Sequence, residues 1–352
     1  MSISFGIVVW IIYLQETSVK VVTVIPSISS SRKIEQISRR YAFFSASIHS
    51  RQRAYIFFAP ITAAAWQRIG YKTVFVFTGD FKQNLNKDHQ AQLNLSRQLL
   101  TNFNVEIIDF QCPEAYAVKM SQIVRLYSGF VSEKIIDDTD LVLTTDSDLI
   151  PMKIDDYNLS NNDDGFIYNA FCCGEFQRHN QSYPMYPISH LCFKKRMWRE
   201  LMLQEFSNPN HKNISLSFEM VSEQMRTEFG SMFDSTMVKG DPTWYMDQIF
   251  ISMSIENYLQ HQSTVHIDRR HKKSIRLDPH LSQQAWDKYG MRRYGDAHLM
   301  HDQIFESYHW AGFRNLLNHL FNSTLINQFE LYYKQFIHTV HESPDQQINE
   351  SI

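Results

Sequence analysis

The chain has 352 residues, of which 43% are hydrophobic and 20% are charged, and its net charge is −3 at neutral pH. This is an ordinary globular composition, long enough for one large α/β domain or for two domains. The weak charge gives no field that would attract nucleic acid or anionic lipid, so a nucleic-acid-binding function is excluded.

The first residues are unusually apolar. Residues 3–14 carry almost no polar side chain, but the run is shorter than the roughly 17–25 residues of a membrane-spanning helix. The length is typical of a signal peptide, while a shortened signal anchor and a buried strand remain open. Residues 1–40 are therefore expected to form an apolar segment and a short stem.

Glycosylation sequons favour the secretory pathway, with the Golgi lumen or membrane as the expected location and the cytoplasm as the alternative. The sequons begin at Asn94, Asn158, Asn180, Asn213, Asn322 and Asn349. The four cysteines are too sparse for a disulfide scaffold, and the adjacent Cys172 and Cys173 lack zinc-site spacing. One or two structural disulfides and buried free thiols are both open.

Strands and helices alternate from Arg40 onward. Strands are expected at 41–47, 73–80, 105–110 and from Leu141, and helices at 51–70, 90–103 and 115–135. Pro60 is expected to kink the first helix or to mark its start. Because the strands are almost continuously apolar, the pattern predicts an α/β fold with a mostly parallel central sheet and helices on both faces.

The stretch "LVLTTDSDLIPM" at 141–152 runs a buried strand into two carboxylates. The two-residue period of a strand points Asp146 and Asp148 the same way, and two such carboxylates repel unless a cation lies beside them. Ligands of parallel sheets bind beyond the carboxyl ends of the strands. A hard divalent ion takes oxygen ligands and leaves positions for phosphate, so the motif predicts a metal that bridges the protein to a nucleotide diphosphate.

The motif has other interpretations. A calcium loop of the EF-hand type fails because Ile150 and Pro151 occupy positions that need a ligand and a glycine. A haloacid-dehalogenase-type phosphotransferase with Asp146 as nucleophile remains an alternative, although its motif usually lies near the start of the domain. A purely structural role of the two carboxylates also remains open.

The element order, with "LVLTTDSDLIP" at a strand end, resembles the metal-dependent GT-A glycosyltransferases over roughly residues 41–320. The segments "YIFFAPITAAAWQRIGY" and "MSQIVRLYSGF" look like one branch of that superfamily. The resemblance implies a GT-A-like (Rossmann-like) catalytic domain at 41–330, with a nucleotide-sugar half at 41–152, an acceptor half at 153–330 and a C-terminal tail at 331–352.

The resemblance also implies donor-binding residues, namely Ser45, Ala46, Ser47, Asp80, Lys119, Gln122, Arg125 and Asp146. Small residues after the first strand let the backbone approach a ligand, although an ordinary turn fits as well. Asp80 would contact the base or ribose, or cap the next segment. The spacing of Lys119, Gln122 and Arg125 aligns them on one side of a helix, where Arg125 would meet phosphate or Asp146; a solvated polar face is the alternative.

His298 is expected to join Asp146 and Asp148 as the third ligand of Mn²⁺ or Mg²⁺, with His301 as the second candidate. In the acceptor half, Asp247 is the expected acceptor contact or general base, or else only a helix-end charge. Trp244, Tyr245 and Gln248 beside it are expected to contact the acceptor.

The expected function is transfer of a hexosyl or related sugar from a UDP- or GDP-sugar to a hydroxyl of a carbohydrate, glycoprotein or glycolipid. Inverting and retaining mechanisms are both open. The alternative is a sugar-nucleotide-binding or carbohydrate-binding protein without turnover, and the apolar N-terminus leaves membrane association possible.

Overall fold

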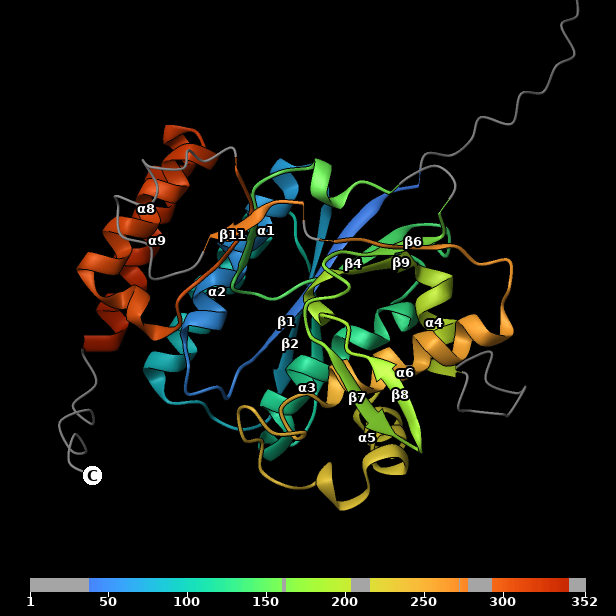
Figure 1. Ribbon diagram of the computed structural model, residues 1–352. Coiled ribbons are helices and arrows are strands. Elements are labelled where there is room, and N and C mark those ends of the chain that lie inside the picture. The colour runs from blue at the N-terminus through green and yellow to red at the C-terminus, as the bar shows by residue number, and fades with distance from the viewer. Residues whose placement is uncertain (1–37, 160–162, 204–215, 272, 278–292, 342–352) are drawn as a thin grey trace, which may run out of the picture. The chain divides into compact units, whose positions relative to one another are not determined.

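A central sheet organises the fold, and its inner strands β1, β2 and β4 are buried along nearly their whole length. The computed structural model describes residues 38–159, 163–203, 216–271, 273–277 and 293–341, which belong to one compact unit (Figure 1). In these residues seven strands pair in the order β10-β6-β9-β4-β1-β2-β3. The strands are β1 (Arg40–Ser47), β2 (Lys72–Gly79), β3 (Glu106–Gln111), β4 (Leu141–Thr144), β6 (Gly165–Ile167), β9 (Leu191–Lys194) and β10 (Ile267–Arg269). Among them β9 alone runs antiparallel to its neighbours, so the expected mostly parallel sheet is confirmed.

The two faces of the sheet contribute to different hydrophobic clusters. Phe43 of β1 and Val76 of β2 belong to one cluster, and the residues that follow them, Phe44 and Phe77, belong to the other. All four side chains are fully buried. Successive residues of a strand point to opposite faces, so a strand covered on both faces must be apolar at every position. This is why the strands read as continuous apolar runs.

Helices cover both faces (Figure 1). One face packs on α1 (Ala54–Arg68), α2 (Lys87–Asn102), α8 (Ser307–Leu320) and α9 (Ser323–His341). The other packs on α3 (Ala117–Ile123), α4 (Lys195–Leu203), α5 (Phe218–Phe229) and α6 (Met246–His261).

Helix α1 runs through Pro60 and does not start there. Proline has no N–H, so the carbonyl of Ile56, one turn earlier, loses its usual partner. The hydroxyl of Ser96 on α2 donates to this carbonyl at 3.1 Å. The buried helix therefore tolerates a proline because a neighbouring helix replaces the missing hydrogen bond.

The strand order reverses between β1 and β4. From β1 the chain continues outward through β2 and β3, whereas β4 lies on the other side of β1. Such a reversal leaves a crevice beyond the carboxyl ends of the two strands, where α/β proteins bind their ligands.

In a second, three-stranded sheet, the middle strand β12 (Tyr294–His298) pairs with β5 (Leu149–Pro151) on one side and with β11 (Ile275–Leu277) on the other. Strand β5 begins directly after the motif. A separate hairpin is formed by β7 (Glu175–Arg178) and β8 (Gln181–Pro184).

Two expected elements are corrected. The single helix expected at 115–135 is wrong, because α3 ends at Ile123 and a 3-10 segment, η2 (Val124–Phe130), follows. A Cβ at Gly129 would lie 2.3 Å from the backbone nitrogen of Arg199, so η2 approaches α4 too closely for any side chain there. The helix expected at 90–103 begins three residues earlier, at Lys87.

The expected N-terminal and C-terminal segments can be compared with the described residues. Helix α9 crosses residue 330, where the tail was expected to begin. The N-terminal segment, residues 1–37, and the sequons at Asn213 and Asn349 lie outside the described residues. None of the helices that the structure describes has the length and apolarity needed to cross a membrane.

Candidate active site

The two motif carboxylates lie on a turn between β4 and β5 that several elements hold in place. The N–H of Thr145 donates to the carbonyl of Phe43 at 3.0 Å. The Thr62 hydroxyl from α1 donates to the carbonyl of Ser147 at 2.6 Å, and the N–H of Leu299 donates to the main-chain carbonyl of Asp148 at 2.8 Å. The motif residues thus have a fixed backbone at the carboxyl ends of β1 and β4.

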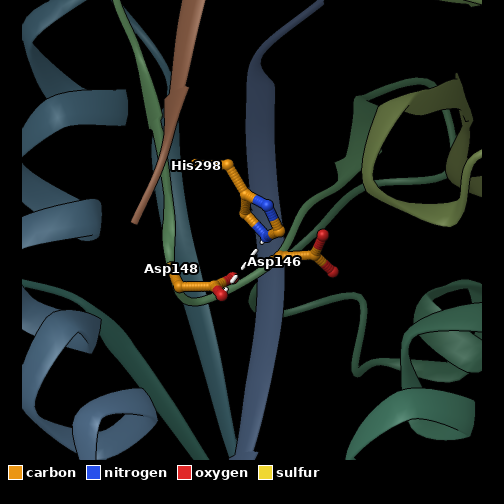
Figure 2. Close-up of side chains that lie close together, drawn as sticks. All are labelled: Asp146, Asp148 and His298. Atoms are coloured by element: carbon orange, nitrogen blue, oxygen red, sulfur yellow. Dashed lines mark ion pairs between the residues drawn. The ribbon is translucent and has the colours of Figure 1, made fainter. Parts of the chain in front are cut away.

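His298 reaches this turn through the second sheet. It is the last residue of β12, which pairs antiparallel with β5 and places His298 opposite Leu149, next to Asp148. Figure 2 shows the side chains of Asp146, Asp148 and His298 close together, and one ligand atom of each lies within 4.8 Å of the others. His298 Nε2 is 3.3 Å from Asp148 Oδ2. The structure therefore brings together the three residues expected to hold the metal.

The chemistry of this cluster fits a divalent cation. Asp148 is buried, whereas the side chains of Asp146 and His298 are 29% and 38% exposed, so the cluster opens on one side. The Asp148 carboxylate raises the pKa of His298 to about 9, against the opposing effect of burial. The proton on His298 thus places a positive charge beside Asp148, where a bound metal ion would also place one. Two carboxylates and an imidazole suit an ion of the manganese type.

Arg125, in η2, joins the motif to the acceptor half. One nitrogen of its guanidinium donates to Asp146, and Nη2 donates to Asp247 Oδ2 at 3.0 Å, while Nε donates to the carbonyl of Gln122 at 3.1 Å. The side chain of Arg125 is only 6% exposed. Burial alone would raise the pKa of the Asp146 carboxyl, but Arg125 and His298 hold that pKa below its ordinary value. Asp146 therefore stays ionised.

Asp247 lies in the first turn of α6 and is buried. Besides the bond from Arg125, its Oδ1 accepts the N–H of Gln248 at 2.8 Å. Burial raises the pKa of Asp247, and Arg125 opposes this effect without cancelling it. Trp244 and Tyr245 precede it and are half-buried. A carboxylate with a raised pKa beside the crevice can accept a proton from a hydroxyl.

Other predicted donor-binding residues lie in ordinary structural settings. Ser45–Ser47 are the end of β1 rather than a loop after it, so that expectation is corrected, and Ser45 donates to the carbonyl of Ser121. Asp80 accepts the N–H of Lys82 at 3.1 Å and so caps its own turn. Lys119 is buried and donates to the carbonyl of Ser235 at 2.8 Å. The structure thus brings Arg125 to the carboxylate cluster but not Lys119.

A second buried network, which was not predicted from the sequence, lies next to the cluster. His190 Nε2 lies 3.2 Å from Asp296 Oδ2, and Arg276 Nε donates to Asp296 Oδ1 at 2.9 Å. Asp296 is fully buried, and it precedes His298 by two residues on β12. The two-residue period of that strand was the available signal, because it places Asp296 and His298 on one face. This histidine–aspartate–arginine network supports the strand that carries His298.

We expect the free energy of unfolding to fall as the pH drops below about 6.5, in part because of His190. Burial lowers the pKa of His190 from 6.5, although Asp296 acts in the opposite direction. Below pH 6.5 the unfolded chain therefore binds a proton that the folded chain does not. The stability that neutral His190 permits is complete above this pH and is lost below it, by at most about 1.4 kcal/mol per pH unit.

Urea unfolding of the wild type and of His190→Gln between about pH 7.5 and pH 5 measures this effect. The variant should show a smaller slope of stability against pH, whatever its stability at neutral pH. Equal slopes would show that folding does not shift the pKa of His190.

The two late histidines should differ in their effect on metal affinity. His298 belongs to the carboxylate cluster, whereas His301 packs its ring against Tyr55 with centroids 5.2 Å apart. We expect His298→Ala to raise the manganese concentration for half-maximal nucleotide binding about ten-fold, because one of three protein ligands is lost. His301→Ala is the matched control and should leave it unchanged. A rise in the control alone would move the third ligand to His301.

Comparison with known proteins gives structural neighbours only. No protein-family model matches the sequence, and no curated protein matches it. Among solved structures, the chain is similar to the galactosyltransferase LgtC in complex with donor and acceptor sugar analogues, at 11% identity and a TM-score of 0.41, over 84% of this chain and 95% of that one.

It is also similar to the bifunctional glycosyltransferase WbbM, at 10% identity and a TM-score of 0.36, over 87% of this chain and 50% of that one. A third neighbour is 4-diphosphocytidyl-2C-methyl-D-erythritol synthase, at 13% identity and a TM-score of 0.29, over 53% of this chain and 84% of that one. At such scores, function must be argued from the side chains of this chain.

Proposed function

We propose that the protein is a metal-dependent glycosyltransferase that moves a sugar from a UDP- or GDP-sugar to an acceptor hydroxyl. The observation that carries this proposal is the convergence of Asp146, Asp148 and His298 within 4.8 Å, on the turn that follows β4. The cluster opens at the crevice where the strand order reverses, which is where an α/β sheet binds a nucleotide.

The cation that suits these ligands is Mn²⁺ or Mg²⁺. Asp148, Asp146 and His298 would hold it, and the ion would offset the charge that builds on the leaving diphosphate. For the ion to bind, His298 must lose the proton that Asp148 favours, because only a neutral imidazole can act as a ligand.

The chain's own residues have distinct tasks in this proposal. Arg125 holds Asp146 and Asp247 with two nitrogens of one guanidinium, so it fixes the spacing between the donor side and the acceptor side. Asp247 contacts the acceptor hydroxyl and, if the reaction inverts, removes its proton. Its raised pKa favours this role because a stronger base accepts a proton more readily. Trp244, Tyr245 and Gln248 would line the acceptor position.

We also propose that the protein enters the secretory pathway. The apolar residues 3–14 and the sequons support entry into the secretory pathway. Among the described sequons, Asn180 lies at the exposed turn between β7 and β8, which makes it the best-placed acceptor for a glycan.

A thermal-shift panel of UDP- and GDP-sugars, with and without manganese, tests the proposed activity and identifies the donor. The matching nucleotide sugar should raise the melting temperature only when manganese is present. Incubation of that donor with manganese should then release nucleoside diphosphate, with water or sugar as acceptor. Binding without any release would favour the alternative, a binding protein without turnover. No shift with any donor would refute the proposal.

A further inference from the structure

The four cysteines all lie in the described part of the chain, and they differ sharply in setting. Cys172 and Cys173, neighbours in sequence, are joined by a disulfide on an exposed loop. Cys112 and Cys192 are buried free thiols, and burial raises the pKa of each to about 12. A thiol reacts as the thiolate, so the two buried cysteines are inert at neutral pH. Thiol chemistry in the folded protein is therefore confined to the adjacent pair.

The loop that carries this pair lies at the sheet edge that also carries the metal cluster. It follows β6, which runs parallel to β4 because both pair antiparallel with β9. Just before the loop, the N–H of Tyr168 donates to the carbonyl of His190 at 3.0 Å. His190 in turn contacts Asp296 in the network beneath His298. The pair is thus connected to the wall of the site by a short series of hydrogen bonds.

The loop is anchored at its two ends. Tyr168 and Ala170 are buried, the N–H of Ala170 donates to the carbonyl of Arg270 at 2.9 Å, and the carbonyl of Gly174 accepts the N–H of Met185 at 2.9 Å. Between these anchors, the N–H of Cys172 donates to the carbonyl of Asn169 at 3.1 Å, and Phe171, which is 57% exposed, stacks on His271 with centroids 4.5 Å apart. A disulfide between adjacent residues closes a small ring around their peptide bond and so restricts this exposed backbone. Its loss would free the stretch between the two anchors.

We propose that Cys172 and Cys173 form a reversible thiol–disulfide exchange site whose redox state sets the order of residues 168–174 within the acceptor half. The acceptor side is taken from the proposed function, but the exchange chemistry does not depend on it. The co-reactant is a dithiol, either a small molecule or a protein with a paired cysteine motif.

The thiol–disulfide exchange conserves atoms and electrons. One thiolate of the dithiol attacks a sulfur of the pair, the Cys172–Cys173 bond breaks, and a mixed disulfide forms. The second thiol of the dithiol then attacks the mixed disulfide. Cys172 and Cys173 leave as two thiols, and the dithiol leaves as a cyclic disulfide, having given up two electrons and two protons. A disulfide of either class reverses the reaction.

Alkylation and hydrogen exchange on the full chain, followed by mass spectrometry, test this site. In the folded protein, iodoacetamide should label neither cysteine before treatment with dithiothreitol and both afterwards, while Cys112 and Cys192 stay unlabelled. Amides of residues 168–174 should then exchange at least about five-fold faster, while those of 141–149 stay unchanged. The double variant Cys172→Ser/Cys173→Ser should show the fast exchange with or without the dithiol.

Two results would overturn the proposal. One concerns the bond itself. Labelling of Cys172 and Cys173 without reductant would show that the pair is not bonded, and reduction only in denaturant would show that the bond is inaccessible in the folded protein. The other is unchanged exchange of residues 168–174 after complete reduction, because the disulfide would then order nothing. Both readouts are independent of nucleotide binding, so failure of the proposed glycosyltransferase activity would leave them interpretable.

Discussion

Asp148→Asn should lower sugar transfer by at least about a hundred-fold and weaken metal-dependent nucleotide binding to a similar degree. Asparagine keeps the shape of the side chain but removes the negative charge that pairs with His298 and that would hold the ion. The turn should survive, because Leu299 bonds to the main-chain carbonyl of Asp148 and not to its carboxylate. Nucleoside diphosphate release at saturating donor, over a manganese titration, measures the loss.

Asp155→Asn is the matched control, because it makes the same chemical change at an exposed position just after the motif. It should leave both activity and the manganese requirement unchanged. The melting temperature of Asp148→Asn should stay close to that of the wild type. Wild-type activity in Asp148→Asn at ordinary manganese concentrations would remove this residue from the metal site.

Asp247→Asn should reduce transfer to an acceptor by about a hundred-fold or more if the reaction inverts and Asp247 is its base. Asparagine can still accept the hydrogen bond from Arg125, but it cannot take a proton at neutral pH. Donor binding should therefore persist. Initial rates at several acceptor concentrations separate the two proposed roles, because loss of a base lowers kcat, whereas loss of an acceptor contact raises KM.

A structural role of Asp247 predicts something else. If the carboxylate only pairs with Arg125, its removal leaves a buried guanidinium with Asp146 as its remaining carboxylate. The melting temperature would then fall and donor binding would weaken together with transfer. A parallel fall of melting temperature, donor binding and transfer would reduce Asp247 to a structural ion pair, and transfer near the wild-type rate would exclude it as the base.

The sheet and the metal cluster were predictable for a common reason. The apolar runs of β1, β2 and β4 identify strands covered on both faces, and parallel strands carry their ligands at the carboxyl end. Asp146 and Asp148 follow β4 directly, so strand period and charge repulsion sufficed to predict a cation there. His298 came from the family resemblance, because no local rule relates it to a motif about 150 residues earlier.

What the sequence did not predict depends on tertiary packing. The helical pattern at 115–135 has no proline to interrupt it, yet the chain leaves the α-helix after Ile123, and η2 packs closely on α4 at Gly129. Lys119 and Arg125 share a helical spacing, but the break gives them different surroundings. His190 and Asp296 lie in unremarkable segments, and only strand pairing brings them together. Long-range contacts of this kind leave no periodic signal.

The proposed function depends on a divalent ion, held by Asp146, Asp148 and His298, that binds the diphosphate of the donor. Calorimetric titration of the full chain with UDP and with GDP, in manganese and in chelator, measures this binding. We expect one of the two nucleotides to bind at least about ten-fold more tightly with manganese than in chelator, and Asp148→Asn to lose this difference. If each nucleotide binds equally in manganese and in chelator, or if neither binds, these residues do not hold a metal that binds the donor.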